Sequence, residues 1–234
     1  MRAFIHWTDQ PRGLKPAALR GCVIAGVMAL FCARFVLADL VTVQGRPTTV
    51  DVKLQQFVRG VLQFRSGTGR RVDRRVEDVQ YLQMTGWEPF NEAEKFRRQG
   101  RHLQSVEQYE AALDALQSAT VGKAATVSSG EVFDIPPDQR LLLLKCRMVQ
   151  AYDELGQFDR AVEIYLDVLG HEAALMDELR PRNLPPERST FLKQALQRVD
   201  EAIDDYGVGD VATMLTRWRN SWPGVTSREV PRRP

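Results

Sequence analysis

Residues 139–169 constrain the fold most, because two apolar stripes at helical spacing lie on either side of one glycine in QRLLLLKCRMVQAYDELGQFDRAVEIYLDVL. Glycine readily adopts the left-handed backbone that ends a helix, so Gly156 predicts the end of the first helix. We therefore predict a helical hairpin whose apolar faces pack together. The first stripe is Leu141, Leu144, Met148, Ala151, Tyr152 and Leu155, and the second is Phe158, Ala161, Val162, Tyr165, Val168 and Leu169.

The hairpin also carries a spaced set of aromatic and small residues. Ala161 is small enough to let the two helices approach closely, while Tyr152 and Phe158 fill the space on either side. This set resembles the signature of a tetratricopeptide repeat (TPR), with Tyr152, Gly156, Phe158, Ala161 and Tyr165 at the matching positions.

A weaker copy of the pattern lies upstream. It departs from the TPR signature at His102, where an aromatic residue is usual, and at Ser105, where alanine is usual. Neither copy has the Trp-Leu-Gly opening or the closing proline of the signature. The matching residues of the upstream copy are Phe96, Gly100, Val106, Tyr109, Ala112 and Leu113.

The resemblance implies a function as well as a fold. In TPR proteins the first helix of each repeat lines a concave groove that holds a segment of a partner protein. Mixed charge in such a groove favours an extended polar peptide, held by hydrogen bonds and ion pairs. A plain solvent-exposed helix surface is the alternative explanation of the same charges. By position, the implied partner-binding residues are Glu94, Arg97 and Arg98 in the first copy and Gln150, Asp153 and Glu154 in the second.

Residues 39–84 have a different period. Val50, Val52 and Leu54 alternate with polar residues, as in a half-buried strand. Four or five short strands fit into this segment, which indicates a small SH3-like or Sm-like barrel or sheet. We expect Gly60 at a bend of a strand and 66–69 (SGTG) in a tight turn. A module this small buries little apolar surface, so we expect it to pack against the helices that follow.

Arginines in the strand region indicate an alternative function for the protein. A basic strand face binds an anionic polymer, such as a nucleic acid or an acidic glycan, through phosphate or other anionic oxygens. Acidic residues are interleaved, however, and no aromatic residues alternate with the arginines to stack bases. A solvated face that blocks edge-to-edge strand pairing explains the same residues. The set is Arg59, Arg65, Arg70, Arg71, Arg74 and Arg75, of which Arg70, Arg71 and Arg74 are the candidate anion-binding residues.

The helical region is predicted to span 85–222, with a loop at 118–137 or a helical extension through 123–125 and a shorter loop. That gap places Gly100 and Gly156 farther apart than the roughly 34 residues of tandem repeats, which argues against a regular solenoid. A short helix is expected over 171–179. A closing pair of helices follows, the first capped by Ser189 or Thr190, and Trp218 and Trp222 are expected in its core. The tail, 223–234, is predicted to be disordered.

The first 38 residues have the features of an export signal. A basic start with Arg2, Arg12, Lys15 and Arg20 precedes an apolar run over 21–33. We predict cleavage after Ala38, with an uncleaved membrane anchor as the alternative; a buried helix of a cytosolic fold is the third explanation. Either export reading places the remainder in the periplasm or cell envelope, with the membrane contacted only through an uncleaved leader.

The sequence shows few signs of a catalytic or metal-binding site. Its formal net charge of +2 does not by itself imply a nucleic-acid partner. Cys146 lies among leucines and is expected to be a buried small side chain. The histidines and acidic pairs match no metal-ligand, nucleotide-binding or triad spacing. We therefore predict an α+β, non-catalytic interaction protein that binds a protein or peptide and uses no metal or cofactor; an enzyme assembled from distant residues is the remaining alternative.

Overall fold

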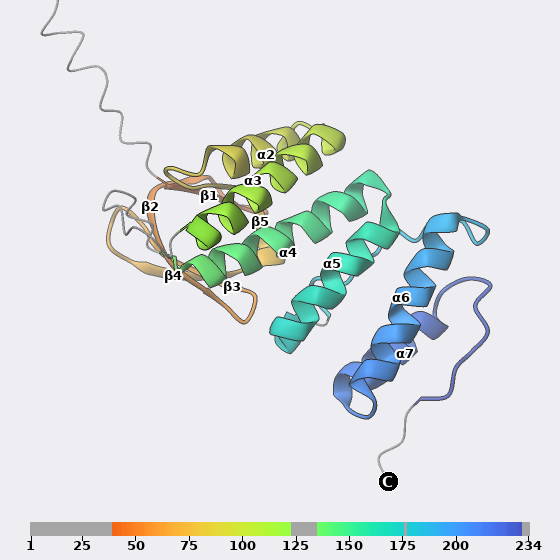
Figure 1. Ribbon diagram of the computed structural model, residues 1–234. Coiled ribbons are helices and arrows are strands. Elements are labelled where there is room, and N and C mark those ends of the chain that lie inside the picture. Colours follow the sequence, from red (N-terminus) through yellow and green to blue (C-terminus); the bar gives the residue numbers. More distant parts are fainter. Residues whose placement is uncertain (1–38, 123–134, 176, 231–234) are drawn as a thin grey trace, which may run out of the picture. The chain divides into compact units, whose positions relative to one another are not determined.

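The chain folds as an antiparallel sheet followed by helices, which confirms the predicted α+β class (Figure 1). This computed structural model describes residues 39–122, 135–175 and 177–230, which belong to the compact unit Ala38–Pro234. The predicted leader, 1–38, and most of the predicted loop at 118–137 lie outside the described residues.

Five strands form the sheet in the order β4-β3-β2-β1-β5, and the pairings are antiparallel. A 3-10 turn, η1 (Val76–Asp78), separates the last two strands. The sheet is open rather than closed into a barrel. The strands are β1 (Asp39–Val43), β2 (Thr49–Val58), β3 (Val61–Arg65), β4 (Arg71–Arg75) and β5 (Val79–Gln83).

Two local features of β2 differ from the predicted alternation. The pairing of β2 with β3 shifts register between Leu54 and Gln56, and this irregularity lets Leu54 and Phe57 both be buried although they are three residues apart. Val58, the residue after Phe57, is exposed. Arg59 and Gly60 both have positive φ and form a two-residue hairpin turn, so Gly60 lies in a turn rather than at a strand bend.

Six helices follow in sequence, and consecutive helices pack against one another. The helix α4 ends at Gly156, whose φ of +81° is left-handed, so the predicted hairpin and its turn are confirmed. The predicted helix over 171–179 is wrong, because α5 runs on to His171 and only a 3-10 turn, η2 (Ala173–Leu175), follows. The helices are α2 (Glu88–Arg98), α3 (His102–Gly122), α4 (Pro137–Leu155), α5 (Phe158–His171), α6 (Thr190–Tyr206) and α7 (Asp210–Asn220).

The last two helices close the apolar face of α5. The Ser189 side chain accepts a hydrogen bond from the backbone N–H of Phe191 at 3.2 Å, which confirms the predicted cap of α6. Trp218 and Trp222 are buried, as expected, and their rings lie 5.0 Å apart between centroids. Trp222 lies edge-on to Phe158 of α5 at 5.2 Å, so this aromatic cluster joins the closing pair to the α4–α5 hairpin.

The tail contacts the closing pair as far as the structure describes it. The backbone N–H of Arg228 donates to Asn220 Oδ1 at 2.8 Å, and its guanidinium lies 3.1 Å from Asp200 Oδ1. Arg228, which lies in the tail predicted to be disordered, therefore contacts both α6 and α7.

A fully buried ion pair fastens the helices to the sheet. The Arg147 guanidinium of α4 donates to both carboxylate oxygens of Glu94 of α2, each at 2.6 Å, and to the carbonyl oxygens of Val79 and Gln80 at 2.7 and 3.3 Å. A fifth bond, to Gln150 Oε1 at 3.0 Å, uses the last of its N–H donors. The sheet therefore packs against the helices, as predicted, through a polar network.

Candidate functional site

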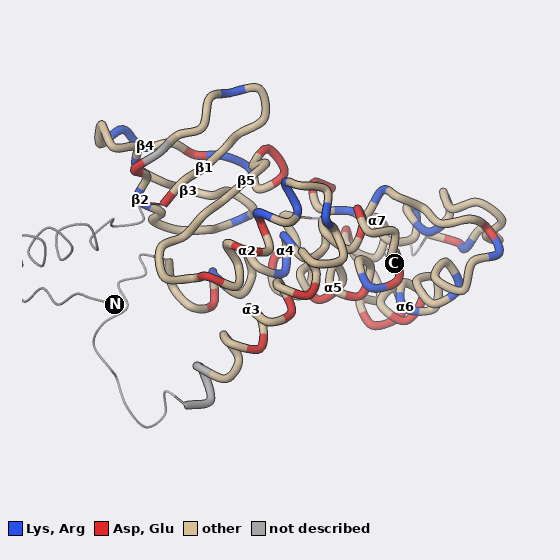
Figure 2. Tube along the Cα trace, turned by 90° about the horizontal axis from the view of Figure 1, so that it is seen from above, with Lys and Arg blue, Asp and Glu red and all other residues tan. Residues whose placement is uncertain are grey.

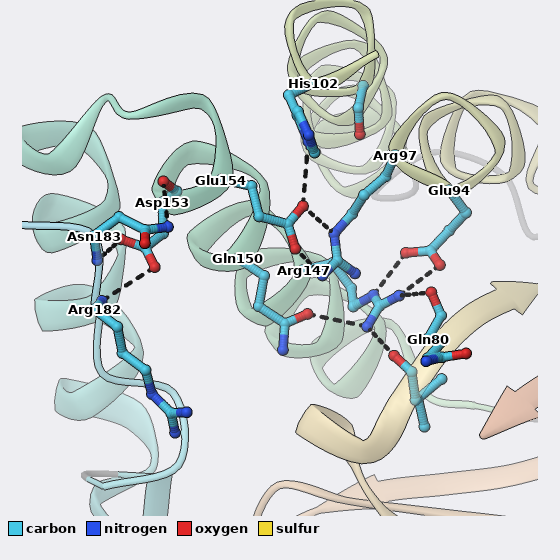
Figure 3. Close-up of polar contacts among 12 residues, drawn as sticks. Gln80, Glu94, Arg97, His102, Arg147, Gln150, Asp153, Glu154, Arg182 and Asn183 are labelled. Carbon is cyan, nitrogen blue, oxygen red and sulfur yellow. Dashed lines mark hydrogen bonds and ion pairs between the residues drawn. The ribbon is translucent and has the colours of Figure 1, made fainter. Parts of the chain in front are cut away.

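A polar pocket of about 310 Å³ lies along α4, on the side that faces α2 and η1. Figure 3 shows α4 between the segment that carries Arg182 and Asn183 on one side and α2 with the sheet on the other. Charged and amide side chains dominate its lining. The lining residues are Glu77, Arg97, Val149, Gln150, Asp153, Glu154 and 178–183.

One end of the pocket is bounded by an ion pair between α2 and α4. Arg97 donates from Nε to Glu154 Oε2 at 2.9 Å and from Nη2 to Glu154 Oε1 at 2.5 Å, which is a bidentate contact. His102 Nδ1 lies 3.3 Å from the same carboxylate. Arg97 Nη1 is buried and has no hydrogen-bond partner among the described residues.

An extended segment of the chain itself forms the opposite wall. The Asp153 carboxylate accepts the backbone N–H groups of Arg182 and Asn183 at 3.1 and 3.0 Å, and the Asn183 amide donates back to the Asp153 carbonyl oxygen at 3.0 Å (Figure 3). Burial raises the pKa of Asp153, while these backbone N–H bonds act to lower it, and burial prevails. A side chain of α4 therefore holds extended backbone by hydrogen bonds.

The sheet contributes an acidic edge to the pocket. Arg75 Nη1 lies 2.8 Å from Glu178 of the extended segment and 3.5 Å from Glu77 of η1. Burial raises the pKa of Glu77, and the neighbouring Glu178 carboxylate raises it further. Glu77 Oε2 has no hydrogen-bond partner among the described residues. The side chains of the pocket wall thus include one buried donor and one buried acceptor that lack a partner among the described residues.

Four of the six predicted partner-binding residues line this pocket: Arg97, Gln150, Asp153 and Glu154. The predicted groove position of Glu94 is wrong, because its side chain is 1% exposed and is surrounded by Arg147, Tyr109 and the backbone N–H of Leu82. Arg98 does not line the pocket; it is exposed, and its guanidinium lies 5.3 Å from the centroid of the Tyr81 ring.

Sequence reasoning missed Arg147 and the wall at 178–183. Arg147 had a usable signal, since it follows Leu143 and Leu144 by four and three residues on the buried face of α4. A charge at such a position requires a buried partner. The wall had only a weak signal, because Pro181, Pro185 and Pro186 exclude a regular helix but do not indicate where an extended chain lies.

The candidate anion-binding residues Arg70, Arg71 and Arg74 line a second, larger hollow of about 720 Å³, together with Arg46. Figure 2 shows basic positions around β4 with acidic positions among them. Arg71 donates to Gln63 and Asp73, and Arg74 donates to the Asp73 carbonyl oxygen. Arg70 has no such contact among the described residues, so two of the three candidates are already engaged within the chain.

No protein-family model, curated protein or solved structure matches this chain. Within the described ranges, no helix is both long and apolar enough to cross a membrane. The same residues contain no group of three or more acidic, histidine or cysteine side chains arranged to hold a metal ion. Cys146 is buried, and burial raises the pKa of its thiol well above the ordinary value.

Proposed function

We propose that this chain is a non-catalytic interaction protein that binds an extended segment of a partner protein along α4, in the polar pocket between α2, η1 and residues 178–183. The observation that carries the proposal is the Asp153 carboxylate, which already holds two consecutive backbone N–H groups of the segment 178–183. The same geometry suits the backbone of an incoming peptide, whose N–H groups need acceptors in place of water.

The unpaired atoms of the pocket support this proposal. Arg97 Nη1 is a donor that suits a carbonyl oxygen and Glu77 Oε2 is an acceptor that suits an N–H group, which are the two groups that every peptide unit offers. Both atoms are buried and lack partners among the described residues, which is costly. A peptide relieves that cost only when the Arg97 and Glu77 side chains move to expose these atoms to it.

The proposal includes the finer fold assignment. We assign the helical part to an irregular TPR-like stack on the strength of its glycine-ended hairpins and the small residues at their crossings. Ser105, which replaces the usual alanine, is buried and donates to the Ala93 carbonyl oxygen at 2.9 Å. The β module is assigned to an SH3-like type, because the bent β2 pairs with β1 at its start and with β3 along its later half. We place the protein in the cell envelope, on the leader sequence alone.

The test is selection from a random peptide library on the full chain, followed by measurement of dissociation constants for the selected peptides. Replacing Arg97 and Asp153 together with alanine is expected to weaken binding at least tenfold. A matched control replaces Arg160 and Glu163, an exposed ion pair on α5 at 2.9 Å. Selection of no peptide, or equal weakening by the control pair, would contradict the proposal.

The arginine-lined hollow supports a second candidate function, the binding of an anionic polymer by the β module. Its support is the convergence of Arg46 and Arg70 on a hollow of about 720 Å³. Binding of a labelled oligonucleotide or heparin fragment would then weaken steeply with salt. Replacing Arg70, Arg71 and Arg74 with glutamine is expected to remove that binding; binding that survives this change would dismiss the candidate.

A further inference from the structure

The segment 177–186, DELRPRNLPP, lies where the proposed function places a partner. Its contacts are those of a bound peptide: Leu179 is buried to 3% exposure, Pro181 is buried, and Glu178 pairs with Arg75 of β4 at 2.8 Å. Within the segment, the backbone N–H groups of Arg182 and Asn183 bond to the Asp153 side chain, whereas the N–H of Leu179 bonds to the Leu175 carbonyl oxygen of η2 and the N–H of Leu184 to the Arg182 carbonyl oxygen.

The space left beside this segment is small. A volume of about 310 Å³ equals roughly ten water molecules at about 30 Å³ each. Two or three residues of a peptide fill it. The pocket is open to solvent, so a longer partner either extends out of it or takes the place of 178–183 at the Asp153 carboxylate.

We infer that residues 177–186 form an internal pseudo-ligand, and that the partner is a proline-containing segment of the same mixed charge that displaces it. This inference rests on the proposed function and names its ligand class. A partner of this kind carries an apolar residue at the position of Leu179, a proline two residues on, and an asparagine at the position of Asn183, which bonds to the Asp153 carbonyl oxygen. Arginines flank the proline on both sides in the chain's own copy.

The contacts that hold residues 177–186 in place are weak enough for a partner segment to replace them. The segment's ion pair to Arg75 is at the surface, where the Arg75 side chain is 61% exposed, and surface pairs of this kind are weak. The exposed residues of the segment are Asp177, Arg182, Asn183, Leu184 and Pro186. The helices on which it lies are held independently, by the buried Arg147–Glu94 pair, so release of the segment leaves that pair in place.

The first test supplies the segment in trans. In the full chain, residues 177–183 are replaced by a glycine–serine sequence of equal length, and the synthetic peptide DELRPRNLPP, with blocked ends, is titrated by fluorescence anisotropy. We expect saturable binding to this variant and at least tenfold weaker binding to the unaltered chain, because the attached copy competes at high effective concentration. Adding Asp153→Ala to the variant is expected to remove binding, whereas adding Glu92→Gln on the exposed side of α2 is expected to leave it unchanged.

Absence of binding to a variant that still unfolds cooperatively would overturn the inference, as would binding that survives Asp153→Ala or equal binding by a scrambled peptide. If library-selected peptides bind the unaltered chain at Arg97 and Asp153 but bear no likeness to 177–186, the proposed function stands and only this inference fails.

A second measurement covers the case in which the replaced segment prevents folding. Amide hydrogen exchange in the unaltered chain reports how the segment opens. We expect the Arg182 and Asn183 amides to exchange at least a hundredfold faster than the amide of Val162 in the core of α5. Exchange of all three at one rate, set by global unfolding, would show that the segment is a permanent part of the fold and would overturn the inference.

Discussion

Arg147 of α4 and Glu94 of α2 form a fully buried ion pair that joins the two helices. Both side chains are buried, and all five guanidinium N–H groups have acceptors drawn from Glu94, Gln150 and the backbone of β5. Such a pair adds less to stability than its geometry implies, because desolvation offsets the Coulomb attraction. Removing one partner, however, leaves a buried charge without compensation.

We therefore predict that Arg147→Ala and Glu94→Ala each lower the free energy of unfolding by about 3–5 kcal/mol. The double variant is expected to lose much less than the sum, because the second change removes the charge that the first one stranded. Urea denaturation of all four proteins measures the cycle. The exposed pair Arg160–Glu163 is the control and should cost roughly 0–1 kcal/mol. Additive losses at 147 and 94 would contradict a shared network.

The same pair predicts a dependence on pH. Burial acts to raise the pKa of Glu94, but the Arg147 charge and hydrogen bonds outweigh it, so the pKa in the fold lies below the ordinary value of 4.5. The stabilisation from ionised Glu94 is then fully present above that value and is lost as pH falls below it. Stability curves of the native chain and Glu94→Gln should converge as the pH is lowered from 6 to 3, and a constant gap would count against the assignment.

At the scale of elements, the helical hairpins were predictable from local sequence signals, whereas the segments that pack around them were not. Gly156, Gly100 and Ser189 set helix ends that were predictable, because a left-handed glycine and a capping hydroxyl act within a few residues. The shifted register of β2 and the path of 178–183 depend on partners far away in the sequence. No local pattern in VDVKLQQFV or LRPRN reports those partners.

Two glycines, Gly156 at the end of α4 and Gly170 within α5, give predictions of opposite sign for the effect of alanine on stability. Gly156 has a φ of +81° and open space around it, so Gly156→Ala should cost about 1 kcal/mol of backbone strain alone. Gly170 lies within α5 without a positive φ, and an added methyl group would meet Tyr206 Oη at an ordinary 3.8 Å. Gly170→Ala should therefore stabilise by up to about 1 kcal/mol. Thermal unfolding of both variants checks the signs; equal signs would refute the hairpin geometry.

At the scale of the whole described chain, the closing pair, α6 and α7, covers the apolar face at the end of the helical stack. Trp218→Ala removes a buried ring that lies edge-on to Tyr165 and Phe158, at 5.4 and 6.2 Å between centroids, and should cost about 3–5 kcal/mol. The control is Phe191→Ala on the exposed side of α6, where the ring is 42% exposed and the change should stay within about 0.5 kcal/mol. Denaturant midpoints compare the two, and similar shifts would show that α6–α7 does not cover the stack.

The candidate site was predictable only in part at this scale. The TPR resemblance placed Arg97, Gln150, Asp153 and Glu154 on one surface, and they do line one pocket. It misplaced Glu94, since the β module packs against that part of the helical surface and Arg147 reaches across 53 positions of sequence to it. The pocket is therefore walled by the sheet and by the chain's own extended segment, neither of which a repeat signature contains.

The central claim is that the polar surface of α4 binds an extended partner segment. The most direct measurement maps backbone amide NMR shifts of the full chain on addition of a library-selected peptide. The account predicts that the largest shifts cluster at residues that line the pocket, namely Glu77, Val149, Gln150, Asp153, Glu154 and 178–183. Shifts concentrated instead on the arginine-lined hollow at 46–49 and 66–74 would contradict it.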